Sequence, residues 1–159
     1  MVLRLFFMVC CVIGHRDVLA TEELEQKVKN TFTELIRRGV TMFLLGSRGK
    51  FNSLALSCLR ELKKDFCGVF KIVYVRAEYL YIDDDYKQYL LNIYDDTYVP
   101  ECVEKANRAV YVVRNRHMID RSDICVFFYN DNAQEKSGTR KAYLYALKTT
   151  KEIINLYNI

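Results

Sequence analysis

Proline is almost absent from this chain of 159 residues, with Pro100 as its single occurrence. The chain also lacks a recognisable linker, an internal repeat and a low-complexity segment. This length is enough for one domain with a substantial hydrophobic core. We therefore expect residues 1–159 to form a single domain, with residues 1–8 as a short apolar extension at its start.

The charge pattern lacks a lysine-rich block or a basic tail, and the formal net charge is only +4. Domains that bind nucleic-acid phosphates without sequence preference are usually more basic. The six cysteines include no C-x-x-C pair, so the spacing typical of metal ligands is missing. We therefore expect neither a nucleic-acid partner nor a metal site. Three cysteines lie in apolar runs, where small core residues are common: Cys10, Cys11 and Cys125.

No apolar run reaches the roughly 20 residues that a membrane-spanning helix needs. Residues 1–13 are apolar around Arg4 and could pass for a short signal peptide. No small-residue cleavage site follows them before His15, and their end also fits a first strand. We expect a cytoplasmic protein without a membrane partner, because reduced cysteines also suit a reducing compartment.

Strand-like and helix-like apolar periods alternate along the chain, a pattern that indicates an α/β fold. The segment 124–129 is continuously apolar, as expected of a central strand in a parallel sheet. We predict a Rossmann-like, doubly wound and mainly parallel sheet with helices on both faces and strand order 3-2-1-4-5. The predicted strands are 9–13, 41–45, 70–75, 109–113, 124–129 and 153–157, and the predicted helices are 21–38, 52–64, 86–94, 100–107 and 139–148.

The densest polar stretch, residues 114–123, stands between the predicted strands 109–113 and 124–129. It holds three arginines, an asparagine, a histidine and two aspartates, so we interpret it as a loop that binds an anion. Asp120 and Asp123 have three interpretations: they orient the arginines, they cap a turn, or Asp120 takes part in catalysis.

Polar or glycine-containing turns follow several predicted strands. They are Gly14-His15-Arg16, Gly46-Ser47-Arg48-Gly49, Arg114-Asn115 and Ser137-Gly138-Thr139. Strand ends of this kind meet at the carboxyl edge of an α/β sheet, which is where ligands bind. A glycine also admits a phosphate close to the backbone, and a helix start offers unpaired N–H groups. Neither a G-x-G-x-x-G motif nor a P-loop is present, and plain turns, a helix cap or a core histidine would explain the same residues.

Six tyrosines lie in the segment 77–99. Such side chains usually pack half-buried with the hydroxyl in water, although one or two could stack on a base. Exposed tyrosines would also suit a protein-interaction scaffold.

Taken in order, these motifs resemble the YpsA-like branch of the SLOG superfamily over about residues 9–157. The superfamily also includes the DNA-processing protein DprA and the LOG-type phosphoribohydrolases. The resemblance implies a Rossmann-like fold that binds a nucleotide or a nucleotide-derived ligand. The motifs are Gly14-His15-Arg16, Gly46 with Phe51-Asn52-Ser53-Leu54-Ala55, Arg114-Asn115 with Met118 and Asp120-Arg121-Ser122-Asp123, and Ser137-Gly138-Thr139. The implied ligand-binding residues are Gly14, His15, Arg16, Gly46, Ser47, Asn52, Arg114, Asn115, Asp120, Ser137, Gly138 and Thr139.

The sequence departs from the resembling families at three informative positions. Ser47 replaces a glycine and Asn52 replaces an acid of the G-G-x-x-G-F-D turn that YpsA-like proteins carry. Ala142 stands where the LOG-type motif P-G-G-x-G-T-x-x-E has its glutamate, so a general acid or base is missing there. We expect a ligand-binding or sensing protein with no further cofactor, and a homo-oligomer is possible. The alternatives are a nucleotide N-glycosidase, with Glu78 or Asp120 as the candidate catalytic group, and a protein-interaction scaffold.

Overall fold

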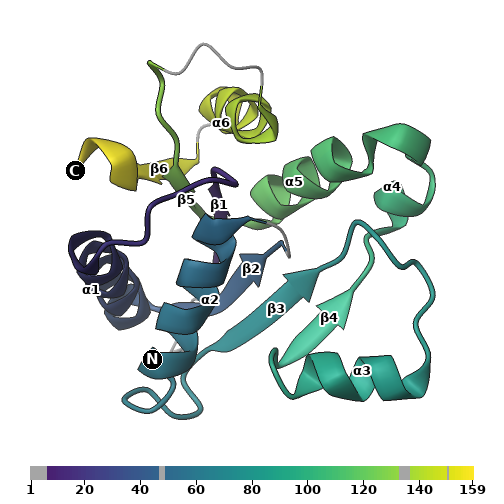
Figure 1. Cartoon of the computed structure of the whole chain (residues 1–159), viewed down its shortest axis with the longest axis horizontal. Coiled ribbons are helices and arrows are strands. Elements are labelled where there is room, and N and C mark those ends of the chain that lie inside the picture. Colours follow the sequence, from purple (N-terminus) through teal and green to yellow (C-terminus); the bar gives the residue numbers. More distant parts are fainter. Residues whose placement is uncertain (1–6, 47–48, 133–136, 150) are drawn as a thin grey trace, which may run out of the picture.

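The computed structural model describes residues 7–46, 49–132, 137–149 and 151–159 (Figure 1). Ser47, one of the predicted ligand-binding residues, lies outside the described residues. Six strands alternate with helices along this part of the chain. The strands are β1 Met8–Gly14, β2 Val40–Leu45, β3 Lys71–Val75, β4 Asp96–Tyr98, β5 Ile124–Phe128 and β6 Glu152–Asn155. The helices are α1 Glu22–Arg38, α2 Lys50–Leu62, α3 Asp84–Leu91, α4 Glu101–Glu104, α5 Val110–Arg121 and α6 Gly138–Lys148, with short 3-10 helices at Asn107–Ala109 and Leu156–Asn158.

The six strands form one parallel sheet in the order β4-β3-β2-β1-β5-β6. β1 lies at the centre, with Cys11 in register with Leu44 of β2 on one side and Cys125 of β5 on the other. Side chains of α1, α2 and α3 are buried against one face of the sheet, and those of α5 and α6 against the other. The prediction of a Rossmann-like α/β fold is therefore confirmed.

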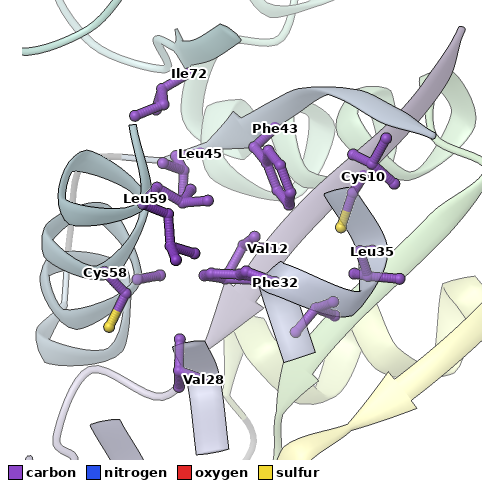
Figure 2. Close-up of a cluster of buried hydrophobic side chains, with 14 of the residues drawn as sticks. Cys10, Val12, Val28, Phe32, Leu35, Phe43, Leu45, Cys58, Leu59 and Ile72 are labelled. Carbon is purple, nitrogen blue, oxygen red and sulfur yellow. The ribbon is translucent and has the colours of Figure 1, made fainter. Parts of the chain in front are cut away.

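The alternation of side chains along β1 explains why both faces are apolar. Cys10 and Val12 belong to the core under α1 and α2, whereas Cys11 and Ile13 belong to the core under α5 and α6. Figure 2 shows the first core, where Phe32 of α1 and Leu59 of α2 converge on Val12. The predicted burial of Cys10, Cys11 and Cys125 is confirmed, and burial raises the pKa of the first two thiols.

The connection between α1 and β2 shows how local sequence sets the element boundaries. Thr21 caps α1, because its hydroxyl oxygen accepts a hydrogen bond from Leu24 N at 3.1 Å. Gly39 ends the helix with a φ of 113°, a conformation that glycine adopts without strain. β2 begins at the next residue, so the chain turns directly from helix to sheet.

The predicted strand 109–113 and the predicted loop 114–123 are both wrong, because this segment forms a 3-10 turn followed by α5. The β-branched residues near its start favour a strand in isolation. Burial follows a helical spacing instead, since Arg114, Met118 and Ile119 are buried. The charged residues Arg116, Asp120 and Arg121 are exposed. The polar run is thus largely the exposed side of a helix.

This correction changes the identity of the strand beside β1. The predicted order of strands places 109–113 next to β1, but β5 pairs with β1 directly. The sheet gains an edge strand that the sequence did not predict, β4, which pairs with β3. Its three residues are too few for an apolar alternation to stand out.

Other predicted boundaries shift by a few residues. α3 begins at Asp84, two residues before the predicted start, because the Asp83 carboxylate accepts a hydrogen bond from Tyr86 N at 2.8 Å and caps the helix. The predicted helix 100–107 shortens to the four residues of α4. Across the described residues, no helix combines the length and the apolar character needed to cross a membrane.

Candidate functional site

A cavity of about 650 Å³ opens at the carboxyl ends of β1 and β2. The chain order changes direction at this place, because β2, β3 and β4 follow on one side of β1 while β5 and β6 lie on the other. Ligands of open α/β sheets bind at such a switch point, and the volume is in the usual range for small-molecule sites. The lining residues are Val12, Ile13, Gly14, His15, Arg16, Asp17, Gly46, Asn52, Tyr111, Arg114, Asn115, Met118, Asn130, Ser137, Gly138 and Thr139.

Ten of the twelve predicted ligand-binding residues line this cavity. Of the other two, Ser47 lies outside the described residues, and Asp120 does not line the cavity. Glu78, the other candidate catalytic residue, does not line it either. The structure thus brings together residues from four separate parts of the chain, and their role in binding stays a prediction.

His15 joins the ends of β1 and β5. Its backbone N–H donates to Phe128 O at 3.2 Å, and its Nε2 accepts from the N–H of Asn130 at 2.9 Å. Because Nε2 is the acceptor, the imidazole is the neutral tautomer with its proton on Nδ1. The ring also lies 5.6 Å from that of Tyr129. His15 therefore fixes the turn after β5 that forms one wall of the cavity.

Gly14 is required by packing within the protein. A Cβ at this position would lie only 2.1 Å from Cδ1 of Phe51, a fully buried side chain of α2. The Phe51 ring in turn stacks on Phe128 at 5.3 Å between centroids. The glycine therefore lets α2 approach the end of β1, and this role is distinct from the predicted approach of a phosphate.

Gly46 makes room for the Arg114 guanidinium. A Cβ on Gly46 would lie 2.8 Å from Arg114 Nη1 and 2.9 Å from Cζ. Arg114 reaches this place from α5 and is only 6% exposed. Its Nη1 donates to Val75 O at 3.2 Å and its Nε to Asn115 Oδ1 at 2.9 Å. One cation thus links α5 to the carboxyl ends of β2 and β3, and it contributes positive charge to the cavity wall.

Arg16 is held at the cavity by its backbone. Its carbonyl oxygen accepts from Lys50 N at 2.8 Å, which joins the turn after β1 to the first turn of α2. Gly49, with a φ of 102°, passes so close that a Cβ there would be 3.0 Å from the Cα of Arg16. The Arg16 side chain is exposed and makes no ion pair with any residue that the structure describes.

The first turn of α6 forms another side of the cavity. The Ser137 hydroxyl accepts from Arg140 N at 3.0 Å and caps the helix, which was one of the interpretations that the sequence left open. The backbone N–H groups of Gly138 and Thr139 lie in the first turn, where the helix offers no carbonyl oxygen to accept their hydrogen bonds. They are therefore available to a ligand. A Cβ on Gly138 would meet no atom within 4 Å, so open space lies beside it.

Six of the lining residues were not predicted as ligand-binding, and three of these carry polar groups: Asp17, Tyr111 and Asn130. Asp17 directly follows the predicted Gly14-His15-Arg16 turn, so its position in the sequence could have indicated it. Tyr111 was assigned to a strand, and only the helical conformation of α5 brings it to the cavity. There its ring lies 5.7 Å from the Arg114 guanidinium carbon.

Neither Asp120 nor Asp123 orients an arginine through an ion pair within the described parts of the chain. Asp123 Oδ2 accepts from Val9 N at 2.9 Å and its N–H donates to Val9 O at 2.8 Å, at the opposite end of β1 from the cavity. Asp120 Oδ1 accepts from the Tyr145 hydroxyl at 2.7 Å, which joins α5 to α6. Both carboxylates therefore connect elements of the fold.

The chemistry around the cavity includes cationic, amide and hydroxyl groups but few acids. Ala142, the position where the resemblance to LOG-type enzymes implies a glutamate, is buried on α6 and carries only a methyl group. Asp17 is the one carboxylate among the described residues that line the cavity. No cluster of three or more histidines, cysteines or carboxylates suited to a metal ion occurs among the described residues.

These features define a Rossmann-like domain with a polar crevice at the carboxyl edge of its sheet. No protein-family model and no curated protein sequence matches the chain. Among solved structures, the chain is similar to DNA processing protein A from Helicobacter pylori, whose structure was described for its single-stranded DNA binding mode. The TM-score is 0.57 and the identity 17%, over 92% of this chain and 63% of that one. This likeness shows a shared fold, and the present chain spans less than two thirds of that protein.

Proposed function

We propose that this protein binds a nucleotide or a nucleotide-derived small molecule in the cavity at the carboxyl edge of the sheet. One observation carries the proposal: residues from the ends of β1 and β2, from α5 and from the start of α6 surround a single polar space. The resemblance to the YpsA-like branch of the SLOG superfamily points to the same class of ligand. The fold shared with DprA, a protein of that superfamily, is consistent with it.

Each part of the cavity suits a different part of a nucleotide. The N–H groups of Gly138 and Thr139, with the exposed guanidinium of Arg16, would bind the phosphate, because a helix start and a guanidinium both favour oxyanions. Asp17 would accept hydrogen bonds from ribose hydroxyls in place of the acid that Asn52 replaces. Tyr111 offers the aromatic ring on which a base could stack.

We propose binding without hydrolysis. A glycosidase needs a general acid or base within reach of the scissile bond. Glu78 and Asp120 lie outside the lining of the cavity, and Ala142 has no ionisable group. The one carboxylate of the described lining, Asp17, is the group that we assign to the ribose hydroxyls. We also favour a small molecule over single-stranded DNA, because the net charge of +4 is low for a protein that binds a phosphate backbone.

A thermal-shift screen of nucleoside mono-, di- and triphosphates and nucleotide sugars tests the proposal. A ligand at 100 times its Kd stabilises the folded state by about 2.7 kcal/mol, which raises the Tm of a chain of this size by roughly 5–10 °C. The best ligand is then titrated calorimetrically against wild type, Arg16→Ala and Gly138→Asp. We expect at least about tenfold weaker binding in both variants, since each loses a charge-assisted contact or gains a repelling carboxylate.

Arg108→Ala is the matched control, because Arg108 is exposed on the 3-10 turn before α5 and does not line the cavity. The Arg108→Ala variant should bind the best ligand of the screen with the affinity of wild type. Equal affinity in Arg16→Ala and Gly138→Asp as well would remove the proposed phosphate site, and the absence of any shift across the panel would remove the nucleotide ligand.

A further inference from the structure

A second surface of the molecule exposes aromatic side chains. The connection from β3 to α3 and the outer side of α3 carry what we call the tyrosine surface: Tyr79, Leu80, Tyr81, Tyr86 and Tyr89. Tyr81 is 91% exposed, Tyr79 62% and Tyr89 58%. The Tyr86 ring lies 5.9 Å from that of Tyr79 and 6.0 Å from that of Tyr89, so the three rings form one continuous aromatic face.

This surface is separate from the cavity. None of the residues that line the cavity belongs to β3, α3 or β4. Figure 1 shows α3 beside the β4 edge of the sheet, whereas the start of α6 lies on the far side of β1 and β5. A function of the tyrosine surface therefore does not depend on the proposed nucleotide site.

A buried arginine holds the exposed segment in place. Tyr79 has a φ of 54°, a left-handed conformation that residues with a Cβ disfavour. Arg76 is only 8% exposed, and its Nη1 donates to Tyr79 O while its Nε donates to Thr97 Oγ1 at 3.1 Å. A residue persists in such a conformation only where its surroundings fix it. Arg76 thus holds the backbone that carries the Tyr79 ring.

The tyrosine surface is also acidic. Residues 77–91 hold four carboxylates and one cation, Lys87, which gives this segment a net charge of −3 in a chain whose total is +4. Asp83, Asp84 and Asp85 are exposed at the start of α3 beside Tyr86. Asp84 and Asp85 make no ion pair within the part of the chain that the structure describes.

Aromatic faces next to carboxylates bind cations. A guanidinium stacks on a tyrosine ring and forms paired hydrogen bonds with a carboxylate, so arginine fits this surface better than lysine. The same carboxylates repel the phosphates of nucleic acids and of anionic lipids. We propose that the tyrosine surface docks an arginine-bearing segment of a partner protein.

The test uses a ten-residue peptide of alternating glycine and arginine, titrated into the full ¹⁵N-labelled chain. Peptides with lysine or glutamate in place of arginine serve as probes of charge and shape. We expect shifts concentrated at residues 79–91, tighter binding of the arginine peptide than of the lysine peptide, and no binding of the glutamate peptide. The affinity should fall as salt rises.

Variants locate the binding surface. The double variant Tyr81→Ser, Tyr89→Ser should bind the arginine peptide about fivefold more weakly or worse, from the size of exposed cation–π contacts. Asp84→Asn with Asp85→Asn should also weaken it and reduce the dependence on salt. Tyr157→Ser is the control, because Tyr157 is 42% exposed on the C-terminal 3-10 turn, away from this surface.

Two outcomes would overturn the proposal. The first is equal binding of the arginine and lysine peptides together with unchanged affinity in the tyrosine double variant, which would reduce the effect to unspecific charge attraction. The second is a wild-type dimer in sedimentation that the tyrosine double variant converts to a monomer, which would make this surface an interface between two copies of the chain.

Discussion

At the scale of single residues, the glycines at the cavity differ in what they accommodate. Gly14 and Gly46 admit atoms of the protein itself, from Phe51 and Arg114 respectively, whereas Gly138 faces open space. The sequence predicted all three as a way to bring a phosphate near the backbone. A sequence does not reveal which atom approaches a glycine, because that atom comes from an element distant in the chain.

The substitution Gly46→Ala separates these roles. The new methyl group would overlap Arg114 Nη1 and Cζ, so we expect the free energy of unfolding to fall by about 1–3 kcal/mol, as overpacking usually costs. Gly138→Ala is the matched control, since its methyl group would meet nothing within 4 Å and stability should stay equal or rise slightly. Urea denaturation measures both. Equal stability of Gly46→Ala and wild type would mean that Arg114 can leave Gly46 at little cost.

At the scale of elements, α5 shows where the prediction from sequence succeeds and where it fails. The polar composition of residues 114–123 drew attention to Arg114 and Asn115, which line the cavity, and their role in binding stays a prediction. The conformation of the segment 109–123 was predicted wrongly, because Val110, Val112 and Val113 favour a strand locally. Packing of Met118 and Ile119 against the sheet outweighs that preference and makes the segment helical. The place of Tyr111 at the cavity and the position of Arg114 on a helix both depend on these tertiary contacts, so the local sequence does not reveal them.

The contact between α5 and β4 gives stability a dependence on pH. The Tyr98 hydroxyl and His117 Nε2 are 2.7 Å apart, and burial, with Arg121 nearby, lowers the pKa of His117 from its ordinary 6.5. Asp120 acts in the opposite direction and more weakly. The unfolded state binds a proton on His117 more readily than the folded state does. The contribution of His117 to the free energy of unfolding is therefore complete above pH 6.5, and it is lost as the pH falls toward the pKa of the folded state.

We therefore expect wild type to lose more stability between pH 7.5 and pH 5.5 than His117→Gln does. Glutamine can hydrogen-bond to Tyr98 but cannot take up a proton in this range. Urea denaturation of both proteins at the two pH values isolates the contribution of His117 from that of the carboxylates. Parallel losses in the two proteins would show that His117 has the same pKa folded and unfolded.

At the scale of the whole molecule, the alternation of strands and helices was enough to predict the fold. Continuous apolar strands predicted burial on both faces, and the central position of β1 with β2 beside it placed two polar turns at one edge. The edge strand β4 could not be predicted, since its pairing with β3 depends on long-range contacts. Parallel strands all end at one edge of the sheet, and the ends of four separated segments therefore meet around one cavity. The general position of the candidate site thus followed from the predicted fold.

The composition of that cavity leads to a prediction about chemistry. We expect no base release from nucleoside monophosphates beyond the rate without protein, because the described lining offers one carboxylate, Asp17, and Ala142 has no acid. A positioned general acid or base contributes about a hundred- to ten-thousand-fold in rate. Chromatography of nucleotide mixtures incubated with wild type and Asp17→Asn provides the measurement, with calorimetry on the same samples. If Asp17 binds ribose, Asp17→Asn weakens binding while the rate stays at background. Turnover by wild type that disappears in Asp17→Asn would instead make Asp17 a catalytic group and this protein a hydrolase.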